Sequence, residues 1–249
     1  MPRTLVAMWT IRRLIRTGIL GPLRAVIPAR KRIGYDLLLA RATHRLEEEL
    51  IHLDRITSGG SLAVDVGANQ GYYSYSLSRR FREVHAFEPN TRLADELERQ
   101  RPANVQVHNI ALSSAVGELD LFIPLVDGVE QHGWASFDPG NLSGARDFRI
   151  LKVPVRRLDD FALGGVAFVK IDVEGHELMV LEGALDTLRR NQPIVLIEIK
   201  RANRDAAFAL FADLGYAPWR LHAGGLERIH DLEEEGENFV FRPESSTTR

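Results

Sequence analysis

The segment "LAVDVGANQGYYSYSLSRRFREVHAFEPN", residues 62–90, holds the pattern that decides the fold. An apolar run leads into a turn bracketed by Gly67 and Gly71, a helical stretch follows, and a second apolar run ends at Glu88. Glycines permit a tight turn in which the backbone can come close to a ligand. The order predicts two parallel strands joined by a helix, with a binding turn between the first strand and the helix.

Further apolar runs extend this pattern along the chain. The runs at 61–66, 166–173 and 194–199 are nearly continuous, which is typical of parallel strands covered by helices on both faces. Other predicted strands are 83–89, 105–112, 118–124 and 238–243, and predicted helices are 91–100, 176–190 and 203–214. The fold class is therefore an α/β open sheet.

Open sheets of this class bind ligands beyond the carboxyl ends of their strands. Polar residues and glycines follow several of the predicted strands, at Asp65 to Gly71, Glu88, Asn109, Asp172 to His176, and Glu198. We expect these residues to gather at one edge of the sheet.

Composition excludes some chemistry. The 249 residues contain no cysteine, which rules out disulfides, thiolate nucleophiles and cysteine-ligated metal centres. A reducing cytoplasm suits such a chain.

The basic residues are unevenly distributed. Residues 1–34 hold eight Arg or Lys and no acid, and the rest of the chain holds 24 basic against 34 acidic residues. We predict a basic helical extension over residues 1–56, whose later part carries Leu46, Leu50, Leu53 and Ile56 at helical spacing, a binding domain over 57–243 and a polar tail over 244–249.

Two locations fit residues 1–34. Their basic amphipathic pattern would suit peripheral contact with the inner face of a membrane, and the alternative is packing on the domain or a partner. The longest uncharged run, residues 4–11, is far too short to span a bilayer. Nucleic acid is not expected as a partner, because the acidic body would repel phosphate.

The opening segment predicts a ligand that contains a nucleoside. Glu88, at the end of the second strand, is placed to accept the hydroxyl hydrogens of a ribose. A dinucleotide would need glycines that receive a pyrophosphate, whereas here Asp65 and Asn69 occupy the turn. A carboxylate favours a cationic ligand, so S-adenosylmethionine is the predicted cofactor, with a nicotinamide-type oxidoreductase as the alternative.

Five motifs, "VDVGANQGYYS", "AFEPN", "NIALS", "VKIDVEGHELMVLEGA" and "PIVLIEIK", resemble the FkbM family of S-adenosylmethionine-dependent methyltransferases in their order and intervals. The resemblance covers roughly residues 60 to 242. It implies a seven-stranded class I methyltransferase (Rossmann-like) sheet, mostly parallel, with its last strand antiparallel. It also implies O-methylation, commonly of sugar or polyketide hydroxyls; a glycolipid would be a lipid-linked acceptor of the same chemistry.

The resemblance to class I methyltransferases also implies the cofactor-binding residues. Asp65, Gly67, Asn69 and Gly71 would surround the methionine part, Glu88 the ribose, and Asn109 with Ala111 the adenine edge.

The motif "KIDVEGHE" supplies candidates for the base that removes the acceptor's proton. His176 has an ordinary pKa near neutrality, and Asp172 or Glu174 would need burial to become as basic. The alternative is that Glu174, His176 and Glu177 cap the helix that follows and complement its dipole. Asp172, Glu174, His176 and Glu198 could also hold a divalent cation, but no compact metal motif is present and no metal is assigned.

Residues 125–150 form a long connection that contains His132, Trp134, Ser136 and Phe137. It is a candidate lid or acceptor pocket, with a mobile surface loop as the alternative. A non-catalytic, membrane-attached protein that retains a nucleoside pocket is the remaining alternative function.

Overall fold

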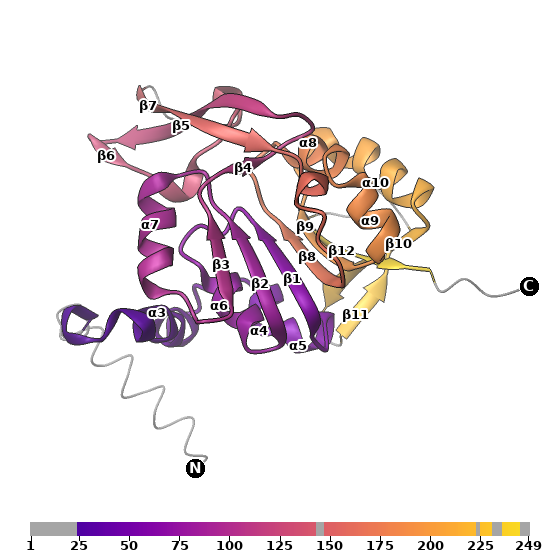
Figure 1. Cartoon of the computed structure of the whole chain (residues 1–249), viewed down its shortest axis with the longest axis horizontal. Helices are drawn as coiled ribbons and strands as arrows, with labels where there is room; N and C mark the ends of the chain where they lie inside the picture. Colours follow the sequence, from indigo (N-terminus) through magenta and orange to yellow (C-terminus); the bar gives the residue numbers. More distant parts are fainter. Residues whose placement is uncertain (1–23, 143–146, 223–224, 231–235, 245–249) are drawn as a thin grey trace, which may run out of the picture.

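The computed structural model describes residues 24–142, 147–222, 225–230 and 236–244. In this part of the chain the main sheet has eight strands in the order β3-β2-β1-β8-β9-β12-β10-β11, with helices on both faces (Figure 1). Its strands are β1 Gly60–Val66, β2 Phe81–Phe87, β3 Val105–His108, β8 Val166–Ile171, β9 Ile194–Glu198, β10 Tyr216–His222, β11 Gly225–Arg228 and β12 Asn238–Pro243.

The sheet confirms the predicted α/β fold. Strands β3, β2, β1, β8 and β9 are parallel neighbours, and the last strand, β12, runs antiparallel between β9 and β10. β10 and β11, which form an edge hairpin, were not predicted as strands, and β11 adds an eighth strand to the seven that the resemblance implies.

Helices cover the two faces of the main sheet. One face carries α3 Ala29–Ala42, α4 Glu48–Ile51, α5 Leu53–Ile56, α6 Tyr72–Ser78 and α7 Thr91–Gln100; the other carries α8 Glu177–Glu182, α9 Leu185–Asn191 and α10 Arg204–Asp213 (Figure 1). The predicted helix at 176–190 is thus two helices, separated at Gly183 and Ala184.

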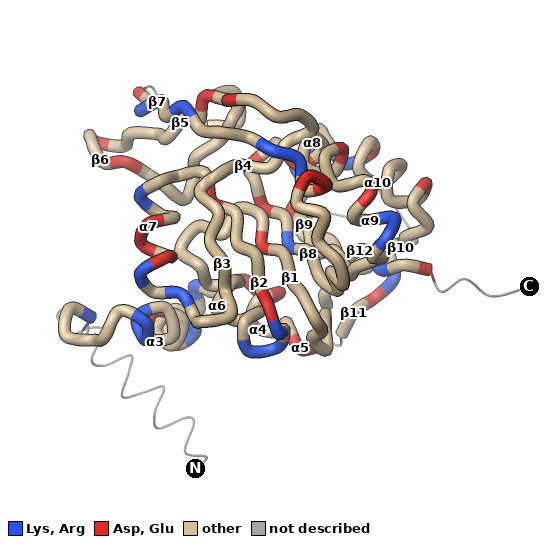
Figure 2. The backbone as a smooth tube through the Cα atoms, viewed as in Figure 1, with Lys and Arg blue, Asp and Glu red and all other residues tan. Residues whose placement is uncertain are grey.

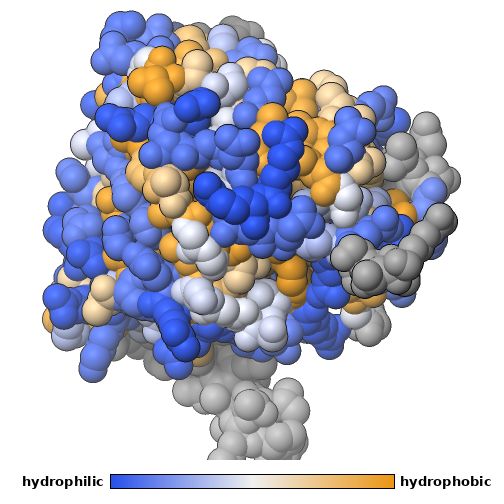
Figure 3. Space-filling model, turned by 45° about the vertical axis from the view of Figure 1, so that its right-hand side comes forward, coloured by the Kyte–Doolittle hydropathy of each residue, from blue (hydrophilic) through white to orange (hydrophobic). Residues whose placement is uncertain are grey.

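Each face has its own hydrophobic core, because successive residues of a strand point to opposite sides. On β1, Val64 and Val66 belong to the core beneath α8 to α10, whereas Ala63 packs with residues of α3, α5 and α6. Asp65 has the same parity as Ala63 and therefore faces α6. On the side shown in Figure 3, the hydrophobic residues that remain at the surface lie in groups among hydrophilic ones.

The predicted helical stripe from Leu46 to Ile56 is not continuous. α3 ends at Ala42, His44 adopts a left-handed conformation, and the short helices α4 and α5 follow. Leu53 and Ile56 are fully buried in the same core as Ala63, so this part of the predicted extension packs on the main sheet.

α3 lies beside α7, and most of its charged positions are basic (Figure 2). Arg24 joins the two helices through ion pairs with Asp36 and Glu96. Residues 1–23, which hold most of the predicted amphipathic segment, and residues 245–249 of the polar tail lie outside the described residues, so membrane contact through residues 1–34 stays a prediction. Among the described helices, none is long and apolar enough to span a bilayer.

A second, smaller sheet lies over one end of the main sheet (Figure 1). Its strands are β4 Ala111–Leu112, β5 Gly117–Val126, β6 Val129–Glu130 and β7 Asp147–Arg156, in the order β4-β7-β5-β6. The predicted strand at 118–124 belongs to this sheet, and its long partner β7 was not predicted. Four short 3-10 helices complete the described elements: η1 His132–Trp134, η2 Pro139–Asn141, η3 Leu158–Phe161 and η4 Arg201–Asn203.

Candidate active site

The glycine turn joins the tips of three strands. Gly67 has φ +80°, and a Cβ atom there would overlap the carbonyl oxygen of Asp172 at the tip of β8. The amides of Gly67 and Ala68 both donate to the carbonyl of Phe87 at the end of β2, at 3.0 Å. Gly71, also at φ +80°, is the N-cap residue of α6, and a Cβ atom there would overlap the side chain of Leu97. The tips of β1, β2 and β8 are therefore adjacent, as the sequence predicted.

Glu88 lies directly after β2 and is 5% exposed. Its Oε2 accepts from the amide of Asn69 at 2.7 Å, and its Oε1 accepts from the amide of Asn90 at 2.9 Å. Burial raises the pKa of Glu88 to about 7. Each carboxylate oxygen has a second lone pair, so Glu88 can still accept hydrogen bonds from a ligand.

A cavity lies in front of Glu88, and we call it the nucleoside cavity. Gly67, Asn69, Glu88, Ala111, Asp172 and Glu174, all predicted site residues, line it. No Lys or Arg is among the described residues of its wall. A pyrophosphate would find no cation here, whereas a nucleoside carrying a positive charge suits the three carboxyl groups.

The predicted lid forms the roof of the nucleoside cavity. His132, Gly133, Ala135 and Phe137 all line it. The ring nitrogens of His132 lie 2.9 Å from Asn90 Nδ2 and 2.9 Å from Arg92 Nη1, which fixes the roof above the Glu88 turn. The cavity encloses about 80 Å³, well below the roughly 300 Å³ at which small-molecule sites begin, so a whole nucleoside would enter only after the roof moves.

Two larger cavities adjoin the glycine turn and share Asn69 with the nucleoside cavity. One, of about 200 Å³, extends from Gly67 and Asp172 toward Arg45, Glu47 and Lys170, and we call it the tail cavity. The other, of about 540 Å³, is lined by Asp36 of α3, by residues along α7 and by residues 130–133 of the lid. The predicted sequence motifs gave no sign of either, because their walls come partly from the segment before β1.

Asp65 and Lys170 are two buried ionisable residues on the strands that lead into the turn. The two residues are register partners on β1 and β8. Ser74 Oγ donates to Asp65 Oδ2 at 2.5 Å, and Asp65 Oδ1 has no partner among the described residues. Lys170 Nζ donates to Asp172 Oδ2 at 2.7 Å and lies over the ring of Tyr73. Burial raises the pKa of Asp65, although Lys170 opposes that rise.

The predicted cofactor-binding residues thus fall into two groups. Gly67, Asn69, Glu88 and Ala111 reach the nucleoside cavity, whereas Asp65 and Gly71 are not among the described residues of its wall.

Asn109 belongs with the supporting residues. Its amide donates to the carbonyls of Glu88 and Pro89, at 2.9 and 3.0 Å, and its Oδ1 accepts from Thr91. Asn109 therefore holds the turn after β2 in place.

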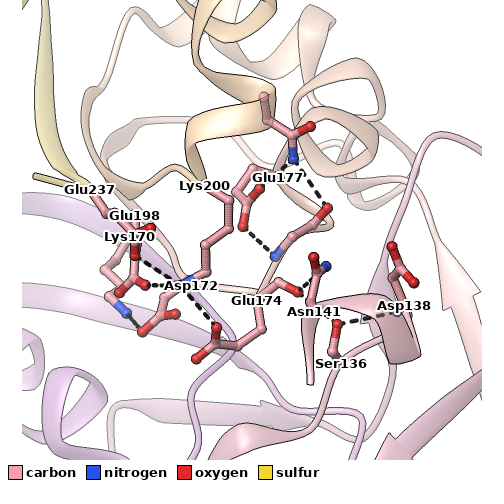
Figure 4. Close-up of polar contacts among 12 residues, drawn as sticks. Ser136, Asp138, Asn141, Lys170, Asp172, Glu174, Glu177, Glu198, Lys200 and Glu237 are labelled. Carbon is pink, nitrogen blue, oxygen red and sulfur yellow. Dashed lines mark hydrogen bonds and ion pairs between the residues drawn. The ribbon is translucent and has the colours of Figure 1, made fainter. Parts of the chain in front are cut away.

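Carboxylates gather at the tips of β8 and β9 (Figure 4). Asp172, Glu174 and Glu198 each present one oxygen within 4.8 Å of the others. Lys200 Nζ contacts three carboxylates: Glu198 at 2.7 Å, Glu237 at 2.9 Å and Glu174 at 3.1 Å. Burial, with the charge of Asp172, raises the pKa of Glu198 to about 7. An ammonium group thus already neutralises part of this cluster, and the sequence gave no signal for Lys200.

The turn at Glu174 is held from two sides (Figure 4). Glu174 and Gly175 have φ of +47° and +99°. From the lid, Ser136 Oγ and Asn141 Nδ2 donate to the Glu174 carbonyl at 2.7 and 3.2 Å. From the other side, the amide of Gly175 donates to Glu177 Oε1 at 2.6 Å. Hydrogen bonds from Ser136 and Asn141 therefore tie the lid to the tip of β8.

His176 does not join this cluster. Its Nε2 lies 3.0 Å from Ser113 Oγ, and its ring packs against Phe137. Burial lowers its pKa, which weakens it as a base. His176 is also the N-cap residue of α8, though its side chain makes no capping hydrogen bond. Of the three predicted catalytic residues, the structure brings Asp172 and Glu174 to the cavity.

Comparison with known proteins agrees with this architecture. The FkbM methyltransferase domain matches residues 65–218. Methyltransferase FkbM from Methylobacillus flagellatus KT superposes with a TM-score of 0.51 at 17% identity, over 92% of this chain and 60% of that one. The chain thus spans about three fifths of the length of that structure.

Two other crystal structures superpose less well. Precorrin 8w decarboxylase from Methanobacterium thermoautotrophicum gives a TM-score of 0.44 at 16% identity, over 80% of this chain and 91% of that one. Precorrin-6y C5,15-methyltransferase from Geobacter metallireducens GS-15 gives 0.42 at 14%, over 77% of this chain and 83% of that one. No curated protein matches the sequence.

The fold is that of a class I methyltransferase, with its cavity at the carboxyl ends of the parallel strands. The domain match covers more than half of the chain, and the chain belongs to the FkbM methyltransferase family.

Proposed function

We propose that this protein transfers a methyl group from S-adenosylmethionine to a hydroxyl of a sugar, glycolipid or polyketide-like acceptor. The observation that carries the proposal is Glu88, a buried carboxylate at the tip of β2 that faces a cavity whose described wall contains no Lys or Arg. When bound, S-adenosylmethionine supplies an electrophilic methyl group on a sulfonium. The surrounding carboxylates of Glu88, Asp172 and Glu174 suit that positive charge.

The residues have separate tasks in this proposal. Glu88 accepts the two ribose hydroxyls, and Ala111 and Leu112 face the base. Asp172 or Glu174, which line the same cavity, accepts the proton of the acceptor hydroxyl. Methyl transfer needs an in-line approach by the acceptor oxygen, so exclusion of water by the lid supports the same step.

An acceptor with several hydroxyls fits the mouth of the site. Carboxylates accept hydrogen bonds from hydroxyl groups. Trp134, which is 60% exposed, stands between Gly133 and Ala135 of the cavity wall and offers a ring that can stack on the apolar face of a sugar. The proposed location is the cytoplasm, where S-adenosylmethionine is made and where a chain without cysteines is at no disadvantage.

The cofactor assignment is tested by ligand binding to Glu88→Ala and Glu88→Gln. Loss of the ribose contacts should weaken S-adenosylmethionine binding about thirtyfold or more in isothermal titration calorimetry. Glu98→Ala, an exposed acid on α7, is the matched control and should bind normally. Because Glu88 also joins two turns, the melting temperature of each variant must be measured; unchanged affinity in a folded Glu88→Gln protein would remove the ribose assignment.

The acceptor assignment needs a second experiment. The protein is incubated with methyl-labelled S-adenosylmethionine and a cell extract, which is then separated into glycan, lipid and small-molecule fractions. Label in a hydroxyl-bearing acceptor that depends on Asp172 would support O-methylation, and label on an amine would contradict it.

A further inference from the structure

The tail cavity continues the nucleoside cavity. The two share Gly67, Asn69 and Asp172, so a ligand whose ribose contacts Glu88 can extend past these residues into the tail cavity. In S-adenosylmethionine, the part of the molecule that lies beyond the sulfonium is an α-amino acid. The tail cavity is the adjoining space on the side of Asp172 and Lys170.

Charges of both signs line the tail cavity. Its basic residues are Arg45 and Lys170, and its acidic residues are Glu47 and Asp172. The nucleoside cavity, in contrast, has acids but no described Lys or Arg in its wall. A wall that carries both positive and negative charges suits a zwitterion, such as the amino-acid end of the cofactor.

Three of these four charged groups already have partners. Lys170 donates to Asp172 at 2.7 Å, and Glu47 Oε2 accepts from the hydroxyl of Tyr73 at 2.8 Å. The guanidinium of Arg45 makes no hydrogen bond or ion pair with any described residue. A ligand carboxylate is the group that an unpaired arginine binds best, because the guanidinium can donate two parallel hydrogen bonds to it.

The backbone holds Arg45 at this position. After α3 ends, His44 adopts a left-handed conformation and the amide of Arg45 donates to the carbonyl of Ala40 at 2.9 Å. Two residues later, Glu47 is anchored to Tyr73 of α6. The chain reversal therefore brings a residue from outside the matched family domain to the wall of the site.

We infer that Arg45 binds the α-carboxylate of S-adenosylmethionine, so that the segment before β1 forms part of the cofactor site. Arg45 is then a positioning residue, since fixing the amino-acid end fixes the direction of the sulfonium methyl group. This inference rests on the proposed function.

The test compares two ligands that differ in one group. S-adenosylmethionine and decarboxylated S-adenosylmethionine are titrated into the full-length protein and into Arg45→Ala by isothermal titration calorimetry. The unmodified protein should prefer the carboxylated ligand about tenfold, and Arg45→Ala should reduce that preference to about one. Arg45→Lys keeps the positive charge but cannot donate two parallel hydrogen bonds to a carboxylate, so it should retain only part of the preference.

The controls separate this inference from the proposed function. Arg41→Ala removes an exposed arginine of α3 outside the tail cavity wall and should leave both affinities unchanged. Equal weakening of both ligands by Arg45→Ala, or no weakening of either, would overturn the role of Arg45 while leaving the cofactor assignment intact. If the unmodified protein binds neither ligand, the proposed function and the inference both fail.

Discussion

The tips of β2 and β8 each present carboxylates to the same cavity, but they are built differently. Glu88, at β2, is bonded to the amides of Asn69 and Asn90, which lie in the same 29-residue segment of the sequence. Glu174, at β8, depends on Ser136 and Asn141 from the lid and on Lys200 after β9. The carboxylate of Glu88 is thus held by local hydrogen bonds, whereas Glu174 is held by distant segments.

This difference indicates that the two strand tips have different roles. A carboxylate held within one strand-turn-helix-strand segment can be the same in enzymes with different acceptors, because the amides that bind it come from that segment. A site built from a lid and two strand tips changes whenever the lid changes. We therefore expect substitutions at the β2 tip to alter cofactor binding, and substitutions at the β8 tip to alter turnover.

The largest expected effect is that of Asp172→Asn. The amide keeps the shape of the side chain but cannot accept a proton, so the methyl transfer rate should fall by about a hundredfold or more. Because Asp172 also lines both cavities of the proposed cofactor site, binding of S-adenosylmethionine should weaken too, but by a smaller factor. Single-turnover rates with the identified acceptor, beside calorimetric affinities, would measure both quantities.

Asp127→Asn serves as the matched control for Asp172→Asn. Asp127 lies at the β5–β6 turn in a left-handed conformation that asparagine also adopts readily. A normal rate in the folded Asp172→Asn protein would exclude Asp172 as the base and leave Glu174.

A smaller effect is expected when the pH changes the charge of Glu88. The folded, unliganded protein holds this pKa at about 7, above the ordinary value near 4.5, and a ribose is bound better by the ionised form. Affinity should therefore rise with pH through 7, by about tenfold between pH 6 and pH 8. 5′-Methylthioadenosine is the suitable ligand, because it contains the nucleoside without the titrating amino group.

Glu88→Gln isolates this titration. The variant cannot ionise at residue 88, so its affinity for 5′-methylthioadenosine should be nearly independent of pH over the same range. A pH dependence shared by both proteins would mean that another group is responsible.

The smallest expected effect is that of Asn141→Ala. This change removes one hydrogen bond to the Glu174 carbonyl and leaves that of Ser136. The free energy involved is about 1 kcal/mol, so kcat should fall about threefold to fivefold, with the affinity for S-adenosylmethionine unchanged. The control is Asn104→Ala, which removes hydrogen bonds to the carbonyls of Ser78 and Phe81 and does not touch the lid. A similar fall in kcat in this variant would mean that the loss of any asparagine hydrogen bond to the backbone has the same effect.

Much of the fold could be predicted because its signals are local. Continuous apolar runs marked β1, β8 and β9, and Gly67 with Glu88 marked the turn and the strand end that face the cavity. β7 was not predicted, because exposed and buried residues alternate irregularly along it and its partner β5 lies about 30 residues away. The helix at 41–56 was predicted as continuous from the spacing of its leucines, but a left-handed residue at His44 and a break at His52 divide this region.

The sequence by itself determined which chemical groups follow which strands: a glycine turn after the first, an acid after the second and a group of acids after "VKI". The tertiary structure alone decided which of those groups meet. It buried Asp65 beside Ser74 and brought His176 to Ser113. It also placed Lys200 among three carboxylates and Arg45 at the wall of the tail cavity. The physical reason is that strand periodicity and glycine geometry act over a few residues, whereas the partner of a charged side chain depends on which distant segments pack beside it.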